Sequence, residues 1–116
     1  ITMEESLEKA LEFSNYSATL NNQKRILYEK YQENLITYYV GGTFTANREL
    51  INFCTMLLSK TSSTLIIDDN KTPIEIDDLE DFTESLLHKY TEATNQYHEE
   101  YKTLSTKRSV EGLVDV

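Results

Sequence analysis

The chain has 116 residues, of which 39% are hydrophobic and 27% are charged, and its formal net charge is −9. This length supports a single domain with one core. The acidic balance argues against binding a nucleic-acid backbone or an anionic membrane surface, and no apolar run is long enough to span a bilayer.

Residues 3–34 are predicted to form one long helix. Thr2 and Glu5 have the spacing of a capping box, in which each side chain accepts a hydrogen bond from the other residue's backbone N–H. Apolar residues then recur every three, four or seven positions, and no Gly or Pro interrupts them. The polar segment 21–25 breaks this stripe, and we expect it to be solvated.

Residues 36–45 change to a period of two and are predicted to form a β-hairpin. β-Branched and aromatic residues alternate here, as is typical of strands. Gly41-Gly42 is expected to supply the positive φ angles of a two-residue turn. Residues 47–60 return to helical spacing, with Asn47 or Thr45 as the predicted N-cap.

A second hairpin is predicted over residues 64–76, "TLIIDDNKTPIEI", with the Asp and Asn residues in its turn. A long helix follows over 78–107, with Asp77 as the expected N-cap. Its apolar residues keep the most regular helical spacing of the chain. Residues 108–116 are predicted to be a tail, because Gly112 is expected to stop the helix.

These elements predict an α+β fold in a single domain over residues 1–116. The order is long N-terminal helix, hairpin, middle helix, hairpin and long C-terminal helix, with the outer helices packed antiparallel. A helix of 30 residues is about 45 Å long, whereas a compact domain of this size is roughly 35 Å across. The overhang should leave apolar surface exposed, and hairpin edges can pair between copies, so we expect a homo-oligomer or a protein partner.

The acidic stretch that begins at Asp68 does not have the pattern of a metal site. A calcium loop starting there has Pro73 at its sixth position and Leu79 at its twelfth, where Gly and Glu are needed. Turns and helix caps account for these carboxylates better. His88 and His98 are ten residues apart, not the four that a zinc pair on a helix requires.

The remaining residues predict no catalytic, cofactor or metal site, and we expect a protein that is not an enzyme. Cys54 has no His close in sequence and lies on the apolar face of its helix, so a buried, inert thiol is expected. Without an internal disulfide partner or a recognisable signal peptide, the chain is expected to be cytoplasmic.

Tyrosine is the one residue type that suggests a contact surface. It supplies contact area while its hydroxyl reaches water or a partner, and its neighbours here are mostly acidic, unlike those in a nucleic-acid reader. We therefore expect these tyrosines in the core or in a protein interface: Tyr28, Tyr31, Tyr38, Tyr39, Tyr90, Tyr97 and Tyr101.

Two resemblances bear on function. The segments "TLIIDDNKTPIEIDDLEDF", "YTEATNQYHEEYKTL" and "RSVEGLVDV" resemble small conserved proteins of T-even-like tailed phages. This resemblance implies a virion or assembly role in a host cytoplasm, with no catalytic residues. The order of elements is also similar to the larger class of prefoldin subunits, although the middle helix is long and the outer helices are short for that family.

Three hypotheses follow. The first is an oligomeric structural or assembly protein, encoded by a phage. The second is a prefoldin-like holdase that binds non-native chains. The third is an acidic decoy or adaptor that binds a basic host protein, motivated by the net charge of −9.

Overall fold

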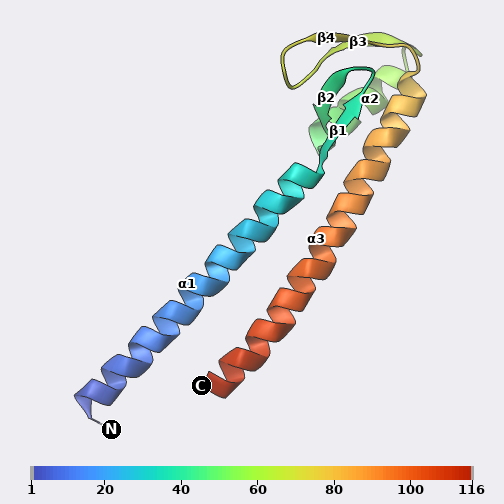
Figure 1. Ribbon diagram of the computed structural model, residues 1–116. Helices are drawn as coiled ribbons and strands as arrows, with labels where there is room; N and C mark the ends of the chain where they lie inside the picture. The colour runs from blue at the N-terminus through green and yellow to red at the C-terminus, as the bar shows by residue number, and fades with distance from the viewer. Residues whose placement is uncertain (1, 116) are drawn as a thin grey trace. The chain divides into compact units, whose positions relative to one another are not determined.

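The computed structural model describes residues 2–115, with side chains through residue 106. It has the predicted α+β order of three helices and two hairpins, which confirms the fold class (Figure 1). The elements are α1 (Met3–Asn34), β1 (Ile36–Tyr39), β2 (Gly42–Thr45), α2 (Arg48–Leu58), β3 (Thr64–Ile67), β4 (Pro73–Ile76) and α3 (Leu79–Asp115).

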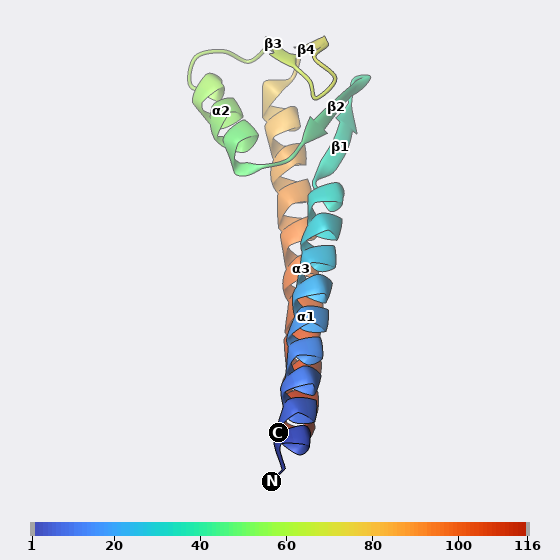
Figure 2. The same cartoon turned by 90° about the vertical axis from the view of Figure 1, so that its left-hand side faces the viewer.

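Two compact units divide these elements. The helix-pair unit takes in the chain up to Lys30 and from Tyr97 onward, and the hairpin unit spans Tyr31–Gln96. Within the helix-pair unit, α1 and α3 lie side by side and run in opposite directions, as predicted (Figures 1 and 2). Folding of the whole chain as one domain stays a prediction.

The first residues of α1 form the predicted capping box. The N–H of Glu5 donates to Thr2 Oγ1 at 3.2 Å, and the N–H of Thr2 donates to Glu5 Oε2 at 3.3 Å. The helix α2 is likewise capped as expected, because Asn47 Oδ1 accepts the N–H of Leu50 at 2.9 Å. These local hydrogen bonds fix where both helices begin.

The first hairpin turns at Val40 and Gly41, so the predicted turn at Gly41-Gly42 is wrong. Tyr39 pairs with Gly42, and both turn residues have positive φ, 49° and 81°, as the favoured two-residue turns require. Gly42 lies inside β2, where a Cβ would meet Ile74 Cγ1 at 2.7 Å. Packing at Gly42 therefore fixes the register, and Val40 takes a conformation that β-branched residues avoid.

The N-cap of α3 is Asp78, one residue later than the predicted Asp77. Its Oδ1 accepts the N–H of Asp81 at 3.0 Å, which is the bond that an N-cap side chain makes two or three residues into the helix. Both aspartates fit the local pattern, and the carbonyl of Asp78 accepts the first backbone bond of the helix, from the N–H of Phe82 at 3.0 Å.

The predicted tail over residues 108–116 is wrong, because α3 continues through Gly112 to Asp115. A glycine within a helix costs only about 1 kcal/mol relative to alanine. It ends a helix where the chain turns left-handed after the last helical residue, and the backbone here stays helical.

The core lies in the hairpin unit, where both hairpins and α2 pack against the first turns of α3. Phe82 of α3 is central: its ring lies 4.8 Å from that of Phe44 and 4.9 Å from that of Tyr39. The fully buried side chains of largest volume are Phe44, Phe82, Ile76, Leu79, Leu86 and Cys54. Apolar burial of this size is the main stabilising term for the unit.

Candidate interaction surfaces

The outer face of the first hairpin is apolar and exposed. Ile36, Tyr38 and Val40 are 36%, 76% and 67% exposed, and we call these three residues the β1 ridge. Ile36 and Tyr38 share one face of the strand because successive side chains alternate, and Val40 follows at the turn. The buried residues Gly42 and Phe44 of β2 hold the hairpin against the core, so the ridge stays outside.

The outer edge of β2 is covered by the loop between β3 and β4. The N–H of Thr43 donates to Asp68 Oδ2 at 2.9 Å, and its carbonyl accepts the N–H of Asp69 at 2.8 Å. The hydroxyl of Thr45 also donates to Asp69 Oδ2, at 2.7 Å. Two strand residues thus have their outward polar groups bound by a single loop.

The outer edge of β1 has no such cover. Tyr38 pairs with Thr43, and in an antiparallel ladder both residues of a pair point their backbone groups the same way, inward or outward. Since Thr43 bonds outward, the N–H and C=O of Tyr38 also point away from the hairpin. Among the residues that the structure describes, none bonds to them on that side.

Asp68 is the buried carboxylate that closes the second hairpin and links it to the first. Its Oδ1 accepts the N–H groups of Thr72 at 2.8 Å and of Asn70 at 3.0 Å. The N–H of Thr43 and then that of Thr72 lower the pKa of the Asp68 carboxyl, because they stabilise its charged form. The prediction that this acidic stretch forms a turn is confirmed. The hydrogen bond between Asp68 and β2 was not predicted from the sequence.

Tyr39 points to the opposite side from the β1 ridge. Its hydroxyl donates to Asp81 Oδ2 at 2.8 Å. Burial, followed by the hydrogen bond to the Asp81 carboxylate and its charge, raises the pKa of Tyr39 to about 12. Tyr39 is therefore a half-buried structural contact between β1 and the start of α3.

In the helix-pair unit, tyrosines form the contact between α1 and α3. The ring of Tyr28 meets that of Tyr97 edge to face at 6.1 Å, and Tyr97 meets Tyr101 at 6.0 Å. The Nζ of Lys24 lies 5.6 Å from the centre of the Tyr101 ring. These aromatic and cation–π contacts are each worth about 0.5–1.5 kcal/mol.

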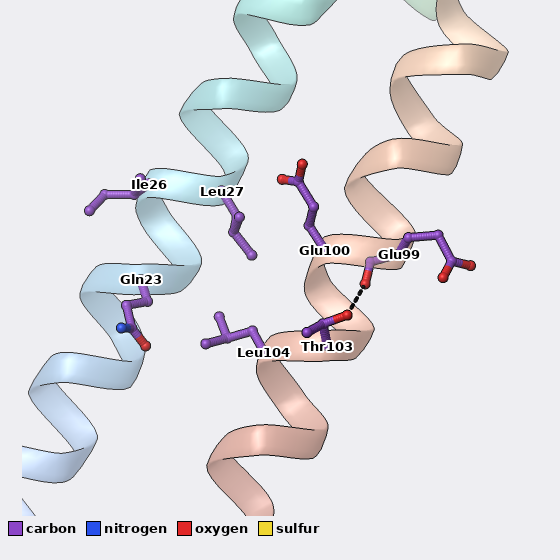
Figure 3. Close-up of a pocket in the computed structure, with 7 residues that line it drawn as sticks. All are labelled: Gln23, Ile26, Leu27, Glu99, Glu100, Thr103 and Leu104. Carbon is purple, nitrogen blue, oxygen red and sulfur yellow. Dashed lines mark hydrogen bonds between the residues drawn. The ribbon is translucent and has the colours of Figure 1, made fainter.

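An open groove of about 470 Å³ lies between α1 and α3 in this unit (Figure 3). Leu27 and Leu104 point toward each other across it, and the Lys30 Nζ–Glu100 Oε1 pair, at 2.7 Å, joins the same two helices. The groove is lined by Gln23, Ile26, Leu27, Glu99, Glu100, Thr103 and Leu104.

The helix α1 has no buried residue along its described length. Met3, Leu7, Leu11 and Phe13 are all exposed, although the first three lie four residues apart and so form a stripe on one side of the helix. Pairing with α3 leaves this stripe in solvent. Such a helix in a stable globular protein normally covers its apolar stripe with another element or another chain.

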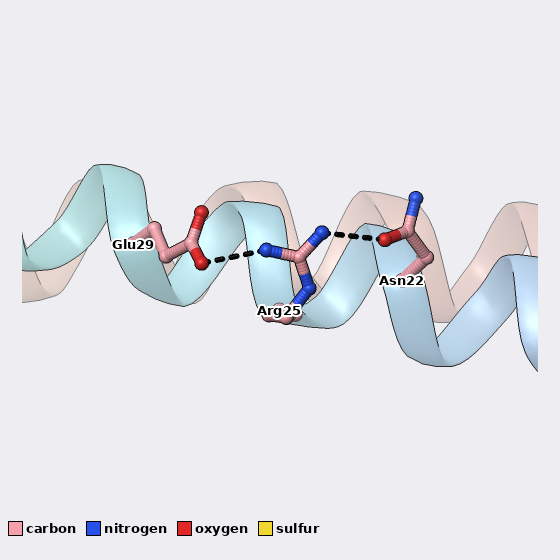
Figure 4. A network of polar contacts seen from close by, with 3 residues as sticks. All are labelled: Asn22, Arg25 and Glu29. Atoms are coloured by element: carbon pink, nitrogen blue, oxygen red, sulfur yellow. Dashed lines mark hydrogen bonds and ion pairs between the residues drawn. The ribbon is translucent and has the colours of Figure 1, made fainter.

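The polar segment 21–25 is solvated only in part: Asn21, Asn22 and Arg25 are exposed, whereas Gln23 and Lys24 are half-buried against α3. Arg25 donates to Glu29 at 2.6 Å and to Asn22 at 2.7 Å along the exposed side of α1 (Figure 4). The side chains of Arg25 and Glu29 are 59% and 58% exposed. Pairs of this kind contribute only about 0.3–0.5 kcal/mol.

The structure separates the seven candidate tyrosines into three groups. Tyr39 and Tyr90 pack against the core, and Tyr31 bonds to Thr94 Oγ1 at 3.0 Å. Tyr28, Tyr97 and Tyr101 belong to the contact between α1 and α3. Tyr38 is the most exposed of the seven and the one within the β1 ridge. An interface role for these residues stays a prediction.

The side chains that could take part in catalysis or metal binding do not lie together in one site. Cys54 is fully buried, and burial raises the pKa of its thiol, with partial opposition from a hydrogen bond with Thr83. His88 forms an exposed pair with Glu92 at 3.2 Å. Among the described residues, no group of three or more His, Cys, Asp or Glu side chains is placed to hold a metal ion.

Comparisons with family models, with curated proteins and with solved structures found no match. Within the residues that the structure describes, no helix has the length and apolar character needed to cross a membrane. The functional proposal therefore rests on the exposed stripe of α1 and on the β1 ridge with its open strand edge.

Proposed function

We propose that this chain is a non-enzymatic structural or assembly subunit that works as an oligomer of identical copies. The resemblance of its sequence to small phage proteins supports a place in a virion or in its assembly. The exposed apolar surface of both units supports the oligomeric part of the proposal.

The exposed apolar stripe of α1 is the observation that carries this proposal. No residue of α1 is buried along its described length, and Met3, Leu7 and Leu11 are exposed although they lie on one side of the helix. The helix has 32 residues and is therefore about 48 Å long. A stable interface buries about 800 Å² from each partner, and a second copy packed along this stripe can supply such an area.

The composition of this surface points the same way. The stripe on α1 and the β1 ridge place large apolar side chains in water on two separate units. Scattered exposed apolar residues are normal, but contiguous groups usually mark protein contacts. Burying them between copies removes apolar area from water at about 25 cal/mol per Å².

Thermal unfolding at several chain concentrations tests this proposal. An oligomer that dissociates on unfolding has a midpoint that rises with concentration, because mass action favours the assembled state. We expect the unfolding midpoint, measured by circular dichroism, to rise by several degrees between about 1 and 100 μM chain. A midpoint that is constant over this range contradicts the proposal.

A holdase is the second candidate, favoured by the exposed stripe of Met3, Leu7 and Leu11 on α1. Such a helix offers apolar side chains to non-native segments of another chain. Suppression of the aggregation of a denatured model protein at equal molar amounts tests this alternative. The stripe variant Leu7→Gln/Leu11→Gln should abolish suppression if the alternative holds, and no suppression by the unmodified chain rejects it.

A further inference from the structure

We propose that β1 pairs edge to edge with β1 of a second copy, antiparallel and about a two-fold axis at Tyr38. The two hairpins then form one four-stranded sheet with the strand order β2, β1, β1 and β2. This inference rests on the proposed self-association and adds the surface through which two copies meet.

The two edges of the first hairpin differ in a way that selects β1. On the β2 side, Asp68 and Asp69 bind the outward backbone groups of Thr43. On the β1 side, the corresponding groups of Tyr38 have no partner among the described residues. An open edge next to a covered one is a template for one further strand.

Charge favours a second copy as the occupant of this edge. Two chains that each carry −9 repel one another, and they approach most easily where neither bears a carboxylate. Residues 34–47 contain no charged side chain, although 27% of the whole chain is charged. This uncharged segment includes the entire first hairpin.

The backbone at Val40 is a second, independent observation. Its φ of 49° lies in the left-handed region, where Asn, Asp or Gly would be accommodated more easily. The side chain is 67% exposed, so it contributes little to the core. A strained, exposed, apolar residue at this turn is explained if its side chain is buried in an assembly.

The second hairpin is a poorer site for the same pairing. Leu65 and Ile67 are also exposed on it, but β4 begins with Pro73, which has no N–H, and presents Glu75 on its exposed face. Proline and charge are both common protections of a strand edge. Leu65 therefore provides a control of similar exposure on the other hairpin.

The proposed axis makes the contact self-complementary. Tyr38 lies opposite Tyr38 of the second copy, and Ile36 lies opposite its Val40. Residues directly opposite each other in an antiparallel pair have Cβ atoms about 4.5–5.5 Å apart. The β1 ridges of the two copies then lie on the same face of the joined sheet.

Light scattering of three chains provides the first test: the unmodified chain, Tyr38→Lys and Leu65→Lys. We expect the lysine at Tyr38 to halve the assembled mass or reduce it to that of the monomer, while Leu65→Lys keeps the full mass. Both substituted side chains are exposed, so both variants should keep the helical spectrum of the parent. An assembled parent whose mass is unchanged by Tyr38→Lys overturns the edge inference and leaves the proposed function in place.

Disulfide trapping provides the second test. Oxidation of Tyr38→Cys should link two copies, because the Cα atoms of a hydrogen-bonded antiparallel pair are about 5.5 Å apart, within the range that disulfides span. Leu65→Cys should remain uncrosslinked under the same conditions, and buried Cys54 should stay reduced in both variants. Equal crosslinking of the two variants contradicts the proposed axis. A parent chain that is monomeric at all concentrations refutes both this inference and the function on which it rests.

Discussion

Gly42 of β2 and Ile74 of β4 approach so closely that no side chain fits between them. A Cβ at Gly42 would lie 2.7 Å from Ile74 Cγ1 and 2.8 Å from Phe44 Cε2. Together with the hydrogen bond from the N–H of Thr43 in β2 to Asp68, this contact joins the two hairpins. The register of the first hairpin is therefore set by its packing on the second.

Gly42→Ala should destabilise the chain by about 1–3 kcal/mol, because the added methyl overpacks a buried contact. Urea unfolding measures the loss. In the double variant Gly42→Ala/Ile74→Ala, the removal of Ile74 side-chain atoms makes room for that methyl. The double variant should therefore lose less than the sum of the single losses, and strict additivity would show that the two residues do not compete for space.

Val40→Asn should stabilise the fold by about 1 kcal/mol, because asparagine tolerates positive φ and precedes glycine in the preferred hairpin turns. The same change removes an apolar side chain from the β1 ridge and should weaken self-association. Urea unfolding of dilute samples and light scattering of concentrated ones measure the two effects separately. A destabilised fold would show that Val40 is not strained at this turn.

Asp68→Asn should lower stability at neutral pH, because the amide cannot replace both carboxylate oxygens that accept backbone N–H groups. The folded state lowers the pKa of Asp68 below its usual 3.8. Its stabilising contribution is therefore present above pH 3.8 and is lost as pH falls through the folded pKa. The difference between the two chains should shrink toward low pH in thermal unfolding, and a constant difference would contradict this linkage.

Asp78→Ala should cost about 1 kcal/mol, the usual loss when a helix N-cap is removed. Asp77→Ala is the matched control: this residue lies one position earlier, and its loss should stay within about 0.5 kcal/mol. Urea unfolding of both variants distinguishes the two assignments. A larger loss at Asp77 would place the cap where the sequence pattern suggested.

Much of the fold follows from local signals. The capping box at Thr2 and Glu5, the cap at Asn47 and the change from a period of three or four to a period of two all lie within a few residues. They predict the helices and hairpins and their order. The apolar pattern of α1 predicts the helix but not burial, since Leu7 and Leu11 match a helical stripe and are exposed.

The wrong turn prediction arose where a distant contact overrides a local preference. Gly41-Gly42 is a plausible turn by itself, and the contact of Gly42 with Ile74 moves the turn to Val40. The two hydrogen bonds between Asp68 or Asp69 and Thr43 join residues about 25 positions apart, so no spacing rule predicts them. The open edge of β1 becomes visible only once that loop is seen to cover β2.

The most direct measurement is the mass of the chain by light scattering coupled to size-exclusion chromatography, at low and high salt. Contacts between opposite charges weaken as the salt concentration rises, because salt screens them. Apolar and strand-edge contacts do not weaken in this way. We predict a defined oligomer, a whole multiple of 13.5 kDa, that persists at high salt. A monomer of 13.5 kDa at both salt concentrations would contradict the account.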